Sequence, residues 1–190
     1  MTDAHPPVAL ADAIVVANAI VLEGLSCDAF KRAEVAGSTR RKKPQVHDIE
    51  VVAAAGDYFG GIPAFLASIG IVRGRPNKAG AKAPWGPKYY KGILTRGRLM
   101  GTQLDLFVVT PPADFNVIWL IRTGSADFSH AFVERLHRWG LRCEDGRILR
   151  GEVALQTRFE EELFALNHLP YIRPELRDMD LPETRALLEG

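Results

Sequence analysis

The segment from Asp48 to Ala55 (Asp-Ile-Glu-Val-Val-Ala-Ala-Ala) constrains the fold of this chain more than any other stretch. Acidic and apolar residues alternate over its first four positions, and the remainder is wholly apolar. This pattern predicts a strand that is buried on one side, with its first residues exposed at an edge. Because residues two apart in a strand point to the same face, Asp48 and Glu50 are expected to project together.

A second apolar run, Leu104 to Thr110, has one acid, Asp105, near its start. If the two strands lie alongside each other, three carboxylates converge. Such carboxylates repel one another unless divalent cations intervene, and oxygen-rich sites prefer magnesium or manganese. Two ions about 4 Å apart would bind the attacking and leaving oxygens of an in-line phosphoryl transfer. Asp48, Glu50 and Asp105 are therefore the expected metal ligands and catalytic residues; surface acids on an edge strand are the alternative.

A Gly-Ser turn precedes the first of these strands in Gly37-Ser38-Thr39-Arg40-Arg41, with six residues between Arg41 and Asp48. Backbone amides and a hydroxyl at such a turn form a small anion-binding concavity. The Arg41 guanidinium adds a planar set of donors that fits phosphate oxygens. The sequence thus predicts a triphosphate site beside the carboxylates, and a solvated basic turn is the competing interpretation.

Thr123-Gly124-Ser125 is expected at a junction between a strand, Val117 to Ile121, and an amphipathic helix, Ser125 to Trp139. A glycine there lets the backbone approach a ligand closely, and a helix N-terminus favours anions or polar sugar groups. Thr123 or Ser125 could instead simply cap the helix. The residues alone leave both interpretations open.

Charge is unevenly distributed along the chain. No acidic residue lies between Asp57 and Asp105, and this interval also contains Trp85, Tyr89 and Tyr90. A basic segment with aromatic residues suits a polyanion that is held by its phosphates and stacked upon, although a solvated loop has the same composition. Gly70 to Gly92, rich in Gly, Pro and Lys, is expected to be a long loop. The candidate DNA-binding residues are Arg73, Arg75, Lys78, Lys82, Lys88, Lys91, Arg96 and Arg98.

Composition restricts the class of protein. The chain has 190 residues, 47% of them hydrophobic and 25% charged, which is typical of a globular protein with one domain or two small lobes. Two cysteines fit neither a disulfide framework nor a zinc site. No apolar run reaches membrane-spanning length, and the N-terminus lacks the basic flank of a signal peptide. A cytoplasmic protein with no membrane partner is expected. Helices over Val8–Leu25, Ile62–Ile69 and Arg158–Leu166, with strands between them, predict an α+β fold.

Taken in order along the chain, these motifs resemble the family X DNA polymerases, the group of polymerase beta and terminal deoxynucleotidyl transferase. Gly-Ser-x-Arg-Arg followed by Asp-x-Glu is similar to the first catalytic motif of that family, and Leu104-Asp105-Leu106-Phe107 to the strand with its third metal ligand. Thr123-Gly124-Ser125 is similar to its element beside the sugar of the incoming nucleotide. The tail, from Glu161-Glu162-Leu163-Phe164 to Leu169-Pro170-Tyr171-Ile172-Arg173-Pro174-Glu175-Leu176, resembles its C-terminal segment.

The resemblance implies a nucleotidyltransferase palm, a mixed sheet with flanking helices, over residues 1–118. It also implies a small α/β nucleotide-binding subdomain over residues 119–190. The first helix leads straight into the Gly-Ser turn, with no lyase or DNA-binding subdomain before it, as in a compact viral member of the family. On this basis we expect no lyase activity, a phage or mobile-element origin, and a monomer in the cytoplasm, near the nucleoid or in a host cell.

The resemblance also implies roles for single residues. Asp48 and Glu50 would bind two Mg²⁺ ions, with Mn²⁺ as a substitute. Asp105 would bind the catalytic ion and help to deprotonate the primer 3′-hydroxyl. The remaining implied contacts are Ser38 and Arg41 to the β- and γ-phosphates, Gly37 at the turn, Thr123, Gly124 and Ser125 along the sugar, and Ser129 at the base edge. His47, before the first acid, matches the template-independent branch of the family.

Three departures from the family pattern stand out. Glu50 replaces the usual Asp, which lengthens the ligand by one methylene and keeps its charge. Ile121-Arg122 stands where polymerase beta has two aromatic residues near the sugar, so weak discrimination against ribonucleotides is expected. Val133 stands where polymerase beta has an Arg that contacts the template, and low fidelity is expected from that change.

The function predicted from these residues is DNA synthesis, directed by a template or by extension of an end. A dNMP would pass from a dNTP to a primer 3′-hydroxyl with release of pyrophosphate, in gap filling or repair. The partners are then DNA primer/template or DNA ends and a dNTP. Two alternatives remain: a nucleotidyltransferase that acts on RNA or a small molecule, and a non-catalytic nucleic-acid-binding module.

Overall fold

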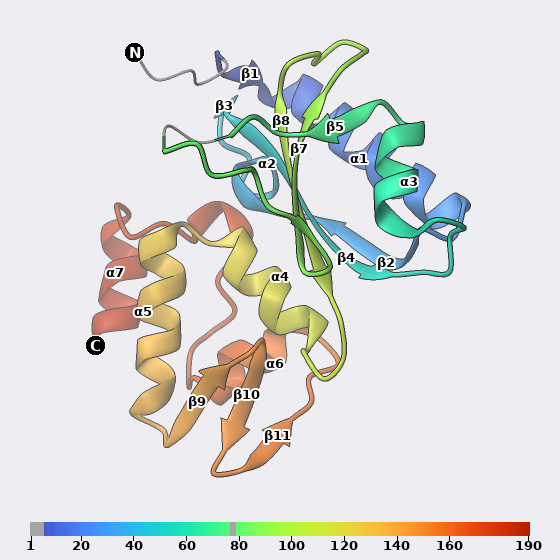
Figure 1. Cartoon of the computed structure of the whole chain (residues 1–190). Helices are drawn as coiled ribbons and strands as arrows, with labels where there is room; N and C mark the ends of the chain where they lie inside the picture. Colours follow the sequence, from blue (N-terminus) through green and yellow to red (C-terminus); the bar gives the residue numbers. More distant parts are fainter. Residues whose placement is uncertain (1–5, 77–78) are drawn as a thin grey trace. The chain divides into compact units, whose positions relative to one another are not determined.

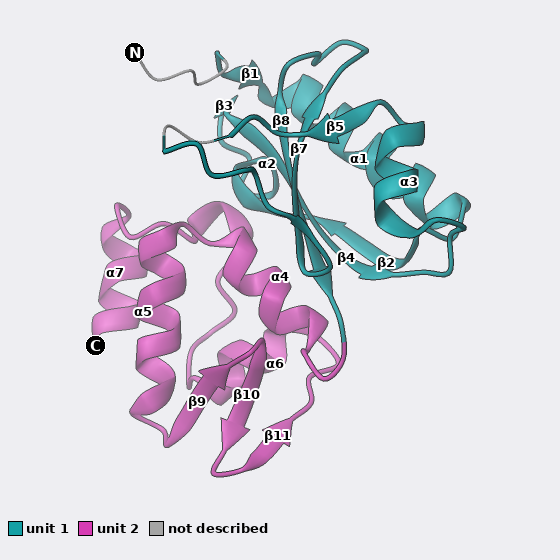
Figure 2. Cartoon of the chain, in the orientation of Figure 1, with its two compact units in different colours: residues 1–110 teal, residues 111–190 magenta. Residues whose placement is uncertain are grey.

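The computed structural model describes residues 6–76 and 79–190 of the chain (Figure 1). These residues divide into two units, with the boundary between Thr110 and Pro111, which Figure 2 shows in different colours. Helices and strands occur in both units, and the first is built on a mixed sheet, so the predicted α+β class is confirmed. The expected division after residue 118 falls inside a helix of the second unit.

The first unit consists of a long helix, a central sheet and two shorter helices. In chain order its elements are β1 (Val8–Ala9), α1 (Leu10–Ser26), β2 (Phe30–Val35), α2 (Gly37–Arg40), β3 (Gln45–Val46), β4 (Asp48–Ala55), α3 (Gly61–Ser68), β5 (Ile71–Arg73), β6 (Trp85–Gly86), β7 (Tyr89–Leu94) and β8 (Gln103–Val109). The strand expected from Asp48 to Ala55 is present with those bounds, and the strand expected from residue 104 begins one residue earlier.

The strands of the central sheet run in the order β2-β4-β8-β7-β5, and β6 pairs with β7. β4 and β8 are parallel neighbours, whereas β2, β7 and β5 are antiparallel to the strands beside them. The two strands that carry an acid near their first residue therefore start at the same end of the sheet.

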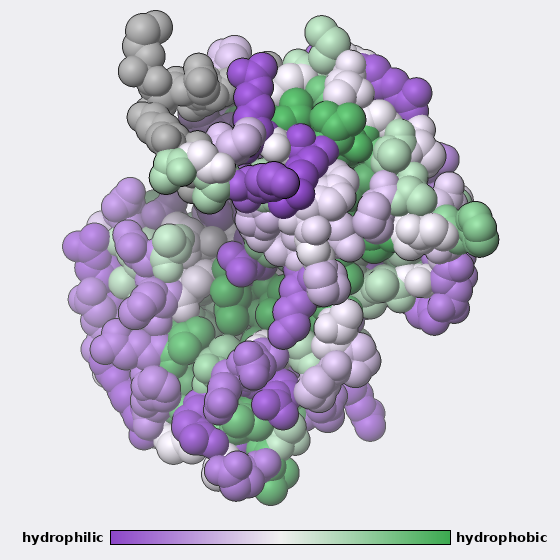
Figure 3. All heavy atoms as spheres, viewed as in Figure 1, coloured by the Kyte–Doolittle hydropathy of each residue, from purple (hydrophilic) through white to green (hydrophobic). Residues whose placement is uncertain are grey.

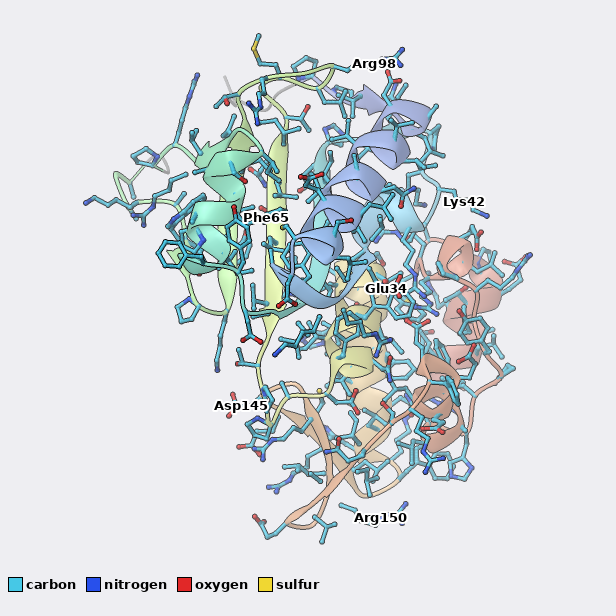
Figure 4. The ribbon with its side chains drawn as sticks, turned by 90° about the vertical axis from the view of Figure 1, so that its right-hand side faces the viewer. Glu34, Lys42, Phe65, Arg98, Asp145 and Arg150 are labelled. Carbon is cyan, nitrogen blue, oxygen red and sulfur yellow. The ribbon has the colours of Figure 1, made fainter. Side chains whose placement is uncertain are left out.

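Helices α1 and α3 cover one face of this sheet (Figure 1). The apolar residues that point to this face include Ile49 of β4 and Leu104 of β8, both completely buried. Phe65 of α3, labelled in Figure 4, is also completely buried and meets the ring of Phe30 edge to face with centroids 5.1 Å apart. Burial of each such side chain contributes roughly 1.5–3 kcal/mol. Since successive strand residues alternate between faces, the acids of β4 and β8 point to the face away from these helices.

The long loop expected from Gly70 to Gly92 is wrong in part, because β5, β6 and the first residues of β7 lie within it. Tyr90, Gly92 and Leu94 are buried, and the residues between them are half-buried. This alternation is the two-residue period of a strand with one covered face. Gly92 suits its place in the sheet, since a Cβ there would collide with Ile71 on β5.

The second unit packs helices against a small antiparallel sheet. Its elements are α4 (Phe115–Thr123), α5 (Ala126–His137), β9 (Leu141–Glu144), β10 (Arg147–Arg150), β11 (Val153–Leu155), α6 (Glu160–Leu166), the 3₁₀ turn η1 (Pro174–Leu176) and α7 (Pro182–Glu189), with the strand order β11-β10-β9. Phe128 and Phe132 on α5 form its core with Phe164 on α6. On the face seen in Figure 3, hydrophilic side chains cover the outer sides of α5 and α7. None of the helices described in either unit is long and apolar enough to cross a membrane.

The strand expected over Val117–Ile121 is wrong, because these residues belong to α4. The helix begins at an N-cap, Asp114, whose Oδ1 accepts a hydrogen bond from the Asn116 N–H at 2.8 Å. The other oxygen, Oδ2, accepts bonds from the Thr157 N–H at 2.8 Å and its hydroxyl at 2.7 Å. A wholly apolar run does not distinguish a buried strand from a buried helix by periodicity, and the cap at Asp114 decides between them.

Candidate active site

The three candidate acids lie on one face of the central sheet. In the parallel pairing of β4 with β8, Glu50 is opposite Asp105, and Asp48 is opposite Gln103. Residues opposite each other in neighbouring strands share a face, and so do residues two apart in one strand. Asp48, Glu50 and Asp105 therefore point to the same side. Asp48 and Glu50 are half-buried, and Asp105 is 8% exposed.

Asp105 is surrounded by polar side chains. The Gln103 side-chain Nε2 donates to both carboxylate oxygens at 3.0 Å, and the Tyr89 hydroxyl also donates to the carboxylate. Burial raises the pKa of Asp105 above 3.8, and the charge of Asp48 raises it further. The charge of Lys91 and the hydrogen bonds from Tyr89 and Gln103 lower this pKa. The loss of hydration is the largest effect, so the ionised carboxylate is held at some cost in free energy.

The donor set suits a hard divalent cation, since carboxylate oxygens are the ligands that Mg²⁺ and Mn²⁺ prefer. The repulsion that Asp48 exerts on Asp105 is the kind that such a cation removes. As the side chains are placed, however, no three His, Cys, Asp or Glu residues of the described ranges converge closely enough to hold a metal ion. Gln103 occupies both oxygens of Asp105, and the Glu50 carboxylate lies against the α-carbon of Gly37. Rotation of these two side chains would be needed to bring the acids together.

The Gly-Ser turn lies directly beside the acids. The Ala36 N–H donates to the Glu50 carbonyl at 2.9 Å and so attaches the start of α2 to β4. Gly37 has φ +58°, a conformation that favours glycine, and any side chain there would collide with the Glu50 carboxylate. The hydroxyls of Ser38 and Thr39 are buried and have no hydrogen-bond partner among the residues the structure describes. A short helix also leaves its first N–H groups without intrahelical acceptors. This end of α2 therefore offers several donors to an anion.

Arg41 and His47 flank this turn. Arg41 directly follows α2 and is half-buried, whereas His47, directly before β4, is exposed. Lys42, labelled in Figure 4, is exposed and has φ +55°, where the chain turns away from α2 toward β3. The structure thus brings together the Gly37-Ser38 turn, Arg41 and the acids of β4 within the first unit.

The Thr123-Gly124-Ser125 segment connects two helices, α4 and α5, rather than a strand and a helix as expected. Ser125 is the N-cap of α5, since its Oγ accepts a hydrogen bond from the Phe128 N–H at 3.2 Å. The Thr123 hydroxyl donates to the Trp119 carbonyl at 2.7 Å. A Cβ at Gly124 would collide with the Phe128 ring. Capping and close packing account for these residues locally, and contact with a sugar stays a prediction.

Ser129 is buried, and its hydroxyl donates to the Ile121 carbonyl at 2.8 Å. This bond ties the second turn of α5 to the end of α4. Contact of Ser129 with a base edge also stays a prediction.

The cations expected to bind DNA occupy different environments. Lys91 is in β7, opposite Asp105. Arg96 donates to the backbone carbonyls of Ser68 and Ile69 at the end of α3, and Arg98 pairs with Asp12 of α1 at 3.2 Å. These two arginines line a pocket of about 660 Å³ on the side of the sheet that α1 and α3 cover. The others are Arg75, Lys82 and Lys88, which are exposed, Arg73, whose Nε donates to the Ala83 carbonyl at 2.7 Å, and Lys78, which lies outside the described residues.

Two polar neighbours of Asp105 were not expected from the sequence. Gln103 is two residues before Asp105, and the two-residue period that predicts the pair Asp48 and Glu50 places Gln103 on the same face. Tyr89 is an aromatic residue of the basic segment, and its ring stacks on Phe107 with centroids 4.8 Å apart. Its contact with Asp105 depends on the register of β7 with β8, which local sequence does not reveal.

Comparison with known proteins defines the class of fold. A crystal structure of Leishmania infantum polymerase beta, described as a ternary P/T complex, is similar to this chain with a TM-score of 0.73. The similarity covers 93% of this chain and 78% of that one, at 16% sequence identity. No family model matches the chain, and no curated protein matches it. The chain therefore has a polymerase-beta-like α+β fold, and the likeness at this identity extends to the fold alone.

Proposed function

We propose that this protein is a nucleotidyltransferase that adds deoxynucleoside monophosphates to the 3′-hydroxyl of DNA. The observation that carries the proposal is the register of β4 with β8, which aligns Glu50 with Asp105 on the face that Asp48 shares. Carboxylates on one face, next to a turn with buried free hydroxyls, are the arrangement that transfer from a triphosphate requires. The polymerase-beta-like fold supports this reaction class.

Asp48, Glu50 and Asp105 would hold two divalent cations, Mg²⁺ or Mn²⁺. When bound, these cations supply Lewis-acid stabilisation of the attacking and leaving oxygens. In the proposed reaction the 3′-oxygen forms a bond to the α-phosphorus, and the bond from that phosphorus to the pyrophosphate oxygen breaks. Asp105 would accept the proton of the 3′-hydroxyl as an ionised carboxylate.

The donors at the start of α2 would bind the leaving pyrophosphate portion of the nucleotide. Ser38 and Thr39 supply hydroxyls, and Arg41 supplies a guanidinium that fits phosphate oxygens. Gly37 is needed because any larger residue would displace Glu50. Contact of Thr123, Gly124 and Ser125 with a sugar, and of Ser129 with a base, stays a prediction from the resemblance.

DNA is the proposed acceptor because the basic segment between Asp57 and Asp105 contains no acidic residue. The same segment contains Trp85 and Tyr89, which are half-buried. Arg75, Lys82 and Lys88 are exposed in this part of the first unit, where phosphates could reach them. Gap filling or end extension, by a monomer in the cytoplasm, is the proposed setting. A transferase for a small molecule would use the same acids and would not need these exposed cations, whereas RNA phosphates would bind them as DNA phosphates do.

Primer extension tests the proposal. Gapped duplex, blunt-ended duplex and single-stranded DNA are each supplied with one dNTP or NTP and with Mg²⁺ or Mn²⁺. We expect labelled extension that falls at least about a thousandfold in Asp105→Asn, which keeps the shape of the side chain and removes its charge. Asp57→Asn is the matched control, since Asp57 is an exposed acid paired with Lys31.

The other outcomes identify the alternatives. Extension by Asp105→Asn at the normal rate would contradict the proposed site. DNA binding by the unmodified chain without extension under any condition would indicate a binding module, and activity confined to RNA or small acceptors would indicate the second class of transferase.

A further inference from the structure

Lys91 lies at the end of the row of acids, directly beside Asp105. It is opposite Asp105 in the antiparallel pairing of β7 with β8, while Glu50 is opposite Asp105 on the other side. Residues opposite one another share a face, so Glu50, Asp105 and Lys91 form one row across three strands. Lys91 is half-buried, and its charge acts on the Asp105 carboxylate.

The backbone of Lys91 is held firmly in this place. Its N–H donates to the Pro84 carbonyl at 2.9 Å, and its carbonyl accepts from the Gly74 N–H at 2.8 Å. The residues on either side, Tyr90 and Gly92, are buried on the helix-covered face. The strand therefore fixes the Lys91 Cα beside the acids, and only the four-carbon side chain is free to move.

An ammonium at this position opposes a free divalent cation on the acid face. The two positive charges repel each other, and the half-buried setting screens the repulsion less than bulk water does. A nucleotide triphosphate reverses the effect, since its phosphate charges attract the ammonium and the cation alike. Lys91 thus affects the two binding events in opposite directions.

We propose that Lys91 weakens the binding of free divalent cations to Asp48, Glu50 and Asp105 and so makes cation binding depend on the triphosphate. The inference rests on the function proposed above, and it makes the metal–nucleotide complex the species that the site takes up. Lys91 is then a residue that sets the order of loading, in addition to any contact that it makes with DNA.

Mn²⁺ binding to the full chain tests this without any turnover. Free Mn²⁺ is measured by electron paramagnetic resonance, first without nucleotide and then with a dATP analogue whose α,β-bridge resists cleavage. We expect Lys91→Met to bind Mn²⁺ about tenfold more tightly than the unmodified chain in the absence of nucleotide. With the analogue present, the difference should shrink to less than about threefold, because the triphosphate offsets the ammonium.

Four further variants separate the explanations. Lys91→Arg keeps the charge and Lys88→Met removes an exposed cation just before the same strand, so both should bind Mn²⁺ like the unmodified chain. Asp105→Asn should weaken Mn²⁺ binding both in the unmodified chain and in Lys91→Met. Lys91→Gln repeats the charge removal with a polar side chain, in case circular dichroism shows that the Met variant is unfolded.

Equal or weaker Mn²⁺ binding by folded Lys91→Met or Lys91→Gln would overturn the inference. If the same variants also lost DNA affinity and salt dependence, Lys91 would be a phosphate contact. A different result would contradict the proposed function itself. In that case Asp105→Asn would not change Mn²⁺ binding, either with Lys91 present or with Met at position 91.

Discussion

Arg177 forms a bidentate ion pair with Glu160 in the interior of the second unit. Nη1 is 2.7 Å from Oε1 and Nη2 is 2.8 Å from Oε2, and the two side chains are 0% and 3% exposed. The Arg177 guanidinium also lies over the rings of Phe164 and Tyr171, at 5.0 and 5.4 Å from their centroids. Its backbone carbonyl accepts from the Ser125 N–H at 3.0 Å. The ion pair therefore joins Arg177 to the start of α6, and the Arg177 carbonyl joins it to the N-cap of α5.

Loss of one member of this pair should destabilise the protein strongly. Arg177→Met leaves the Glu160 carboxylate buried without a counter-charge, and we expect a loss of about 3–5 kcal/mol in the free energy of unfolding. The double variant Glu160→Leu, Arg177→Met removes both charges and should recover most of that loss. Urea unfolding followed by circular dichroism measures both values. A double variant less stable than the single one would show that the ion pair itself is not the cause.

Gly37→Ala should disrupt the proposed phosphate site. The new methyl group meets the Glu50 carboxylate, and the backbone at φ +58° is strained for any residue but glycine. We expect triphosphate affinity to fall at least about tenfold and stability to fall by roughly 1–2 kcal/mol. Gly80→Ala is the matched control: φ is +77° there, and no atom of the described residues lies within 4 Å of the added carbon. It should lose some stability and no affinity. Equal affinity in both variants would argue against a role for the turn.

Ser125→Ala tests whether capping explains the segment between α4 and α5. Removal of the hydroxyl that accepts from the Phe128 N–H should lower the free energy of unfolding by about 1 kcal/mol. If the hydroxyl serves only as a cap, Ser125→Asp should restore the stability and the nucleotide affinity together, since aspartate caps helices well. Restored stability with nucleotide affinity still reduced would support contact with the nucleotide. Thermal unfolding and nucleotide titration of the same samples separate the two.

The strands that could be predicted from the sequence are those whose own residue pattern shows which side is buried. The alternation from Asp48 to Glu50, followed by a wholly apolar run, predicts both the strand and the face on which the acids lie. β7 was missed because Tyr89 to Leu94 does not alternate apolar with polar residues, and because Gly, Pro and Lys dominate the composition before it. α4 was missed because its apolar residues do not reveal a period.

Contacts between distant segments could not be predicted from local pattern. Glu160 reads as one of several exposed acids near the C-terminus, and its buried partner Arg177 is 17 residues further on. Lys91 reads as one of many lysines in a basic stretch until the register of β7 places it opposite Asp105. Strand register is set by packing and turn geometry along the whole sheet, so residues such as these emerge only from the structure.

The raised pKa of Asp105 has a consequence for stability that does not depend on any assay of activity. Burial raises this pKa in the folded chain above the ordinary value of 3.8, so near that pH the folded chain binds more protons than the unfolded one. Stability from this group is then fully present below pH 3.8 and is lost as the pH rises through the folded pKa. Without metal, Asp105→Asn should be more stable than the unmodified chain at pH 7, and the difference should vanish as the pH falls below 3.8.

Divalent cations should reverse this difference, because they favour the ionised carboxylate and bind the folded chain alone. Excess Mg²⁺ or Mn²⁺ at pH 7 should raise the unfolding midpoint of the unmodified chain and leave that of Asp105→Asn nearly unchanged. Urea unfolding at a series of pH values, with and without the cation, measures both effects. Asp57→Asn, which removes an exposed acid, should behave as the unmodified chain in each series. If the variants at 57 and 105 responded alike to the cation, the acid face would not be where it binds.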